Sequence, residues 1–76
     1  MYRISINHKS GDPSEFTGID RVEYFIAGME QVIEGKDIGT HKFPTSNNLY
    51  LFSSSEKYTC SINGDDISSI IVESED

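Results

Sequence analysis

Short runs of alternating apolar and polar residues, separated by clusters of turn-forming residues, constrain the fold of this chain more than any other feature. Tyr2, Ile4 and Ile6 alternate with polar residues, and residues 9–13 that follow are dense in turn formers. Alternation with a period of two is typical of a strand that buries one face. We therefore expect a first strand that ends before residue 9.

The central segment, residues 19–34, supports two predictions. Its apolar residues recur at spacings of three and four, and Asp20 with Glu23 offers a capping box, which together favour an amphipathic helix. A central Gly28 costs a helix about 1 kcal/mol relative to alanine, and the residues before it are β-branched and aromatic. We therefore expect a hairpin that turns at Ala27 and Gly28, and keep as the alternative an α+β fold with this helix packed on the sheet.

The second half of the chain gives clearer strand signals. A loop at residues 44–48 and a connection at residues 53–57 separate predicted strands at residues 49–52, 58–62 and 67–72. The dipeptide Asn63-Gly64 favours a tight turn, so the last two strands are expected to pair as a hairpin. The sequence thus predicts a mainly β domain over residues 1–76, a small antiparallel sheet or partly open barrel of five or six short strands. Its acidic end is expected to fray from about residue 73.

The charge of the chain limits the partners that it would attract. Thirteen acidic residues against six basic ones give a net charge of −7. This charge repels nucleic acid and anionic membranes at long range, so neither is expected as a direct partner. The charge either keeps a small protein soluble or meets a basic surface on another protein, and the sequence leaves both interpretations open.

Cysteine content and hydropathy indicate the compartment. The single cysteine, Cys60, excludes an internal disulfide and a zinc site of four cysteines. No window approaches the ~18 apolar residues of a membrane span, and the first nine residues lack the apolar region of a signal peptide. The expected location is the cytoplasm.

Known catalytic and ligand-binding motifs do not occur in the sequence. His8 and His41 lack the spacing of a metal site, the serines at residues 53–55 lack the nucleophile motif G-x-S-x-G, and no phosphate-binding glycine loop is present. Cys60 alternates in phase with Tyr58 and is expected in the core. We therefore expect no catalytic, cofactor or metal residues and no enzyme activity; a small enzyme that uses Cys60 and a histidine is the alternative.

Aromatic residues are the best candidates for contact with a partner. Tyr50, Phe52 and Tyr58 cannot all point into a thin core if the leucines between them already fill it, so some are expected to face outward. Exposed aromatic side chains among acids are typical of protein-binding surfaces, although a second buried face would also explain them. The candidate partner-binding residues are Asp65, Asp66, Tyr50, Phe52, Glu56, Glu73 and Glu75.

Several segments carry a resemblance to a group of known proteins. The runs Gly35-Lys36-Asp37-Ile38, His41-Lys42-Phe43-Pro44 and Leu49-Tyr50-Leu51-Phe52, with the closing residues 66–72, resemble small acidic proteins of phages and mobile elements of Gram-positive bacteria. The resemblance covers about half of the chain and brings no catalytic residues.

The resemblance implies a protein that acts on host machinery in the host cytoplasm. The expected function is inhibition or modulation of a basic host protein, such as a restriction or CRISPR nuclease, in the extreme case by carboxylates that imitate DNA phosphates. The alternative is a structural or assembly protein that self-associates through sheet edges, for example as a homodimer.

Overall fold

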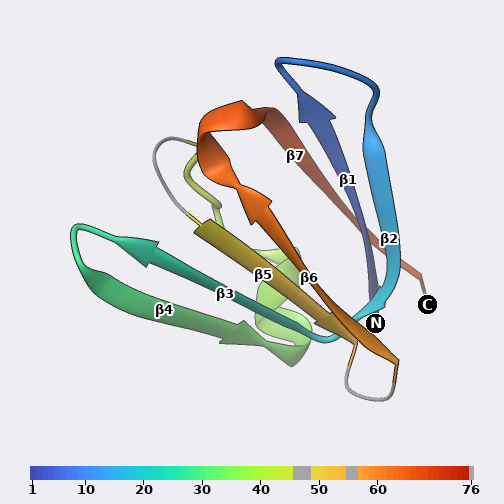
Figure 1. Ribbon diagram of the computed structural model, residues 1–76. Coiled ribbons are helices and arrows are strands. Elements are labelled where there is room, and N and C mark those ends of the chain that lie inside the picture. The colour runs from blue at the N-terminus through green and yellow to red at the C-terminus, as the bar shows by residue number, and fades with distance from the viewer. Residues whose placement is uncertain (46–48, 55–56, 76) are drawn as a thin grey trace.

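Seven strands in two antiparallel sheets make up the described part of the chain (Figure 1). The computed structural model describes residues 1–45, 49–54 and 57–75. The strands are β1 (Tyr2–His8), β2 (Ser14–Ile19), β3 (Arg21–Ile26), β4 (Met29–Glu34), β5 (Leu49–Ser54), β6 (Tyr58–Asn63) and β7 (Ile67–Ser74). Two short 3₁₀ turns, η1 (Gly35–Gly39) and η2 (Gly64–Asp66), complete the fold. The prediction of a mainly β, antiparallel fold is confirmed, with the strands divided between two sheets.

One core joins the two sheets. The first sheet has the strand order β2-β1-β7 and the second the order β4-β3-β5-β6. Both contribute to one cluster of buried side chains: Ile4, Ile6, Ile19, Val22, Tyr24, Ile38, Tyr50, Phe52 and Ile67. Over the described ranges, no helix has the length and apolar character needed to cross a membrane.

The central hairpin is confirmed, and the alternative helix over residues 19–34 is wrong. β3 and β4 pair antiparallel, and Ile26 lies opposite Met29 at the end of the ladder. Between them Ala27 and Gly28 have φ values of 52° and 78°, as a two-residue type I′ turn requires. β3 also pairs with β5, so its β-favouring residues are bonded on both sides, which outweighs the helical spacing.

The predicted hairpin at Asn63-Gly64 is wrong, because β6 and β7 belong to different sheets. β6 pairs with β5, whereas β7 pairs with β1 along its whole length. Asn63 keeps an extended φ of −74°, and its side chain accepts a hydrogen bond of 3.0 Å from the backbone N–H of Asp65. The asparagine thus starts the η2 corner, at which the chain changes sheets.

β2 has no counterpart among the predicted strands, because a bulge breaks its period-two pattern. Tyr2 pairs with Ile19 and Ile4 with Phe16, so three steps on β2 match two steps on β1. Gly18 supplies the left-handed backbone of the bulge, with a φ of 68°. Phe16 and Ile19 therefore both pack on the core although they are three residues apart.

The sequence predicted that the acidic end of the chain frays from about residue 73. In the structure, β7 pairs with β1 as far as Ser74. The guanidinium of Arg3 lies 3.1 Å from the Glu73 carboxylate. The Glu75 N–H donates to the carbonyl of Met1 at 3.1 Å, and the Glu75 carboxylate accepts a 2.7 Å bond from the N–H of Gly18.

The expectation that Tyr50 and Phe52 face a partner is wrong. Both side chains are fully buried and stack with ring centroids 5.6 Å apart, whereas Leu49 on the opposite face of β5 is 49% exposed. The larger rings fill the space between the sheets, and the leucines take the outer positions. Cys60, which lies opposite Phe52 on β6, is half-buried.

Truncation of the two faces of β5 should have unequal effects on stability. Phe52→Ala opens a cavity at the centre of the core and should lower the free energy of unfolding by about 3–5 kcal/mol. Leu49→Ala removes an exposed side chain and should cost less than about 1 kcal/mol. Urea unfolding followed by circular dichroism measures both. Equal losses would contradict the assignment of Phe52 to the core.

Candidate functional site

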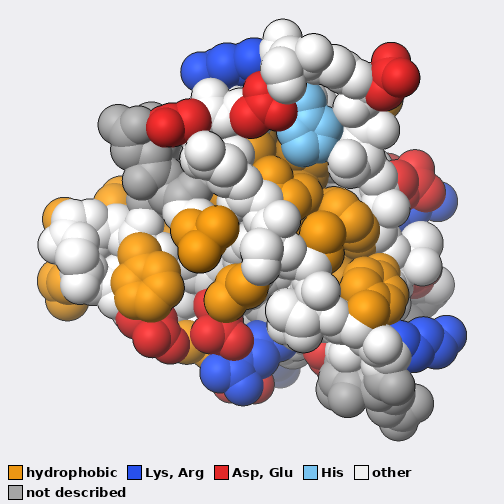
Figure 2. Space-filling view, in the orientation of Figure 1, with side chains coloured by type: hydrophobic (Ala, Val, Ile, Leu, Met, Phe, Trp, Pro, Cys, Tyr) orange, Lys and Arg blue, Asp and Glu red, His pale blue; other side chains and the backbone are white. Residues whose placement is uncertain are grey.

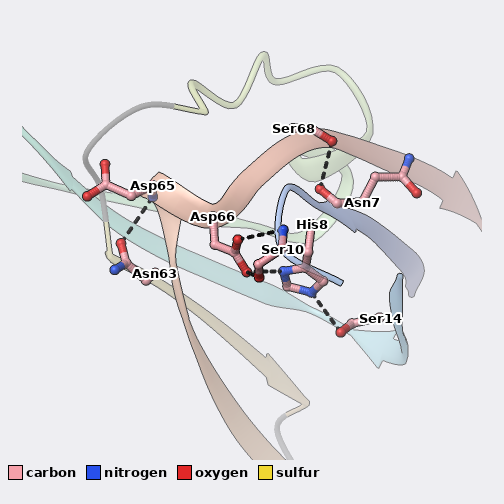
Figure 3. A network of polar contacts seen from close by, with 8 residues as sticks. All are labelled: Asn7, His8, Ser10, Ser14, Asn63, Asp65, Asp66 and Ser68. Carbon is pink, nitrogen blue, oxygen red and sulfur yellow. Dashed lines mark hydrogen bonds and ion pairs between the residues drawn. The ribbon is translucent and has the colours of Figure 1, made fainter. Parts of the chain in front are cut away.

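A cluster of polar side chains surrounds His8, where β1, β2 and η2 meet (Figure 3). His8 ends β1, and its side chain is only 14% exposed. Its Nε2 lies 2.8 Å from the hydroxyl oxygen of Ser14, the first residue of β2. Its Nδ1 lies 3.2 Å from Oδ2 of Asp66, the last residue of η2. One imidazole thus joins a serine and a carboxylate from distant parts of the sequence.

The loop between β1 and β2 holds Asp66 in place. The Ser10 backbone N–H donates to Oδ1 at 3.0 Å, and the Ser10 hydroxyl donates to Oδ2 at 2.7 Å. The Lys9 N–H donates to the Asp66 carbonyl at 2.6 Å. Hydrogen bonds from Ser10, assisted by the nearby His8, hold the pKa of Asp66 below its ordinary value despite partial burial. The carboxylate is therefore ionised at neutral pH.

These contacts define how protons are arranged on His8. A carboxylate can only accept, so the proton of the neutral ring belongs on Nδ1, facing Asp66. Nε2 then accepts from the Ser14 hydroxyl. Nδ1 is buried and close to Oδ2, but its N–H is not aligned for a hydrogen bond, so this contact is electrostatic. The arrangement can take up a proton from Ser14 and stabilise the resulting imidazolium beside Asp66.

A second candidate site is the outer face of the four-stranded sheet. Phe25, Val32 and Leu49 expose 44%, 39% and 49% of their surface on the face turned away from the core. Figure 2 shows hydrophobic side chains exposed beside acidic ones over this part of the molecule. Glu30 lies opposite Phe25 in the ladder, so the exposed apolar surface has an acidic border.

The edge of this sheet is β4, and half of its backbone points outward. The ladder pairs Ile26 with Met29, and the Gly35 N–H donates to the carbonyl of Asp20 at 3.3 Å. In a two-residue hairpin this register directs residues 29, 31 and 33 towards β3. The N–H and C=O groups of residues 30, 32 and 34 therefore face away from it. Their side chains are exposed and read glutamate, valine, glutamate.

A cavity of about 460 Å³ adjoins one end of this edge. It is lined by Asp20, Arg21, Glu23, Glu34, Gly35, Ser53, Ser54 and Thr59. The Arg21 guanidinium forms an ion pair with the Glu23 carboxylate at 2.9 Å. Glu34 is thus one of the residues that line a space large enough for the cationic end of a lysine or arginine.

The predicted partner-binding residues do not form one surface. Asp65 and Asp66 precede β7, whereas Glu73 and Glu75 lie at its other end. Six extended residues lie between Asp66 and Glu73, so the two groups are roughly 23 Å apart. Tyr50 and Phe52 are in the core, and Glu56 lies outside the described residues.

Neither site is predicted by the sequence, for different reasons. The alternation of Glu30, Val32 and Glu34 is visible in the sequence, but its meaning depends on β4 being an edge strand. The contact between His8, Ser14 and Asp66 carries no sequence signal, because it depends on the η2 corner.

Comparison of the chain with models of protein families, with curated proteins and with solved structures gives no match in any of the three. A function for the chain is therefore inferred from its own residues and their geometry.

Acid should abolish the contribution of Asp66 to stability. Because the pKa of Asp66 is lower in the folded chain than its ordinary value of 3.8, its stabilisation is present above that value. It is lost as the pH falls through the lower, folded pKa. Thermal unfolding at pH 5 should show Asp66→Asn melting below the wild type, and the difference should narrow as the pH falls below 3.8.

Asp12→Asn in the same loop is the matched control and should melt like the wild type throughout. A difference between Asp66→Asn and the wild type that stays constant from pH 5 to pH 2 would contradict the role given to the Asp66 carboxylate.

Proposed function

We propose that this chain binds a basic protein by adding an extended segment of that protein to the edge of β4. The segment becomes a fifth strand of the four-stranded sheet. The observation that carries the proposal is the outward-facing backbone of residues 30, 32 and 34 beside the side chains of Glu30, Val32 and Glu34. In strand addition, main-chain hydrogen bonds supply affinity and alternate side chains supply specificity.

The side chains of β4 specify the chemistry of the incoming strand. Its residues beside Glu30 and Glu34 would be lysine or arginine, and the residue between them, beside Val32, would be apolar. The cavity at Glu34 gives one cation room to enter. The net charge of −7 accelerates encounter with a basic surface.

Charge favours a basic partner over a second copy of the chain at this edge. Two copies that paired β4 with β4 about Val32 would place Glu30 of one opposite Glu34 of the other. Like charges directly opposite each other destabilise a pair of strands. Self-association would therefore have to use another edge.

Nucleic-acid-binding proteins are the partner class that fits best. Such proteins carry basic segments, and the resemblance to phage-borne proteins suggests a host nuclease or similar protein in the cytoplasm. The mode proposed is strand addition, because the two glutamates of the edge do not form the long row of charges that imitation of DNA requires.

A synthetic peptide tests the proposal without knowledge of the partner. The probe is a capped seven-residue peptide with lysine, valine and lysine at alternate positions, and the control has glutamate in place of lysine. Titration followed by NMR should show binding of the lysine peptide alone, with shifts confined to β4. The double variant Glu30→Gln/Glu34→Gln should weaken binding about tenfold, since exposed charge pairs are worth ~0.2–1 kcal/mol each.

Two variants separate charge from backbone pairing. The double variant Asp12→Asn/Glu15→Gln removes the same charge elsewhere and should bind almost as the wild type does. Val32→Pro removes an outward N–H, so the hairpin should survive while peptide binding is lost. Equal binding of the lysine and glutamate peptides, or shifts centred on β7, would refute strand addition at β4.

A further inference from the structure

We infer that Ser14 is a nucleophile, activated by His8, that accepts acyl groups from carboxylic esters. This inference is independent of the proposed binding function, because the residues belong to the three-stranded sheet and η2 and not to the β4 edge. It departs from the expectation, drawn from sequence motifs, that the chain performs no chemistry.

The arrangement is that of a serine, a base and an orienting carboxylate. Ser14 Oγ lies 2.8 Å from His8 Nε2, within the range at which a base activates a hydroxyl. Asp66 Oδ2 lies 3.2 Å from Nδ1 on the opposite side of the ring. Figure 3 shows the imidazole between Ser14 on one side and Asp66 with Ser10 on the other. Triads of this kind are recognised by geometry and roles, not by sequence position.

The hydrogen bonding of His8 favours a catalytic role over a purely structural role at the end of the core. Nδ1 is buried without an aligned hydrogen bond, whereas buried polar atoms that serve only structure are nearly always bonded. Catalytic hydrogen bonds are often poorly aligned without substrate and tighten when it binds. Part of the ring remains exposed and Ser14 itself is only half-buried, so a small ester can approach the serine.

The Asp66 carboxylate is positioned to stabilise a positive charge on His8. Ser10 holds both carboxylate oxygens through its backbone N–H and its hydroxyl, which keeps Asp66 ionised and oriented. A fixed carboxylate beside Nδ1 maintains the reactive tautomer and favours the imidazolium that forms during proton transfer. Ser10 is thus a positioning residue.

The reaction proceeds in two balanced steps. Ser14 Oγ bonds to the carbonyl carbon of the ester while its proton moves to Nε2. The carbon–oxygen bond to the alcohol then breaks, and the alcohol leaves with that proton. Water next adds to the acyl carbon and gives a proton to Nε2; the bond to Ser14 breaks, Ser14 regains the proton and the carboxylic acid is released. The net change is hydrolysis of one ester by one water.

The charge of the chain restricts the substrate. Asp66 carries negative charge at the site, and the whole chain carries −7. Anionic esters are repelled, so the expected substrates are uncharged or cationic carboxylic esters.

An uncharged fluorophosphonate probe tests the inference directly on the full chain. Ser14 Oγ should displace fluoride from phosphorus, and mass spectrometry of peptides should place the single adduct on Ser14. General-base assistance is worth about 10²–10⁴-fold, so His8→Gln should slow labelling at least about a hundredfold. Hydrolysis of p-nitrophenyl acetate should fall in parallel.

Control variants and a denatured sample make the test decisive. Ser61→Ala removes an exposed serine on β6 and should label as fast as the wild type. Ser14→Ala should lose the adduct while far-UV circular dichroism shows an intact fold; if this variant unfolds, the peptide map of the wild type still identifies the labelled residue. The inference is overturned if the folded wild type labels no faster than in denaturant, if the adduct maps elsewhere, or if folded His8→Gln labels at the wild-type rate.

Discussion

Stacking of the β5 aromatic rings between the two sheets is the interaction on which the structure depends. Tyr50 and Phe52 lie nearly parallel, at 8°, and extend the stack to Tyr24 at 5.2 Å and to Phe16 at 5.9 Å. A chain of this length buries only about 60% of its unfolded surface, so large rings must supply much of its core. The Tyr50 hydroxyl also donates to the carbonyl of Pro44, which ties the segment after η1 to the sheet.

The direction of these rings determines which surfaces remain for function. Because Tyr50 and Phe52 point inward, the leucines of β5 and Phe25 of β3 lie on the outer face. Because β3 pairs with β5, β4 becomes an edge strand, and its outward backbone groups pair with no other strand of the described residues. The sheet change at η2 brings Asp66 beside His8. The proposed binding edge and the proposed nucleophile are thus consequences of one packing arrangement, located on different sheets.

Local patterns in the sequence predicted most strands but only some of their partners. The β3–β4 hairpin was predictable because its turn and both strands lie within a few residues of one another. β2 was not, because the bulge at Gly18 places Phe16 and Ile19 on one face and breaks the alternation. The partners of β7 and the facing of β5 depend on contacts between distant segments. The contact between His8 and Asp66 could not be predicted for the same reason. The acidic pattern of β4 is visible in the sequence, but its role as a binding edge follows only once β4 is known to be an edge strand.

The proposed binding mode requires β4 to be an open edge, ready to pair with another strand. Amide hydrogen exchange of the free chain, read residue by residue by NMR, measures this most directly. Slow exchange is predicted at Gln31 and Ile33, whose N–H groups face β3, and fast exchange at Glu30, Val32 and Glu34. Equal protection at all five amides would mean that the edge is already covered and would contradict the account.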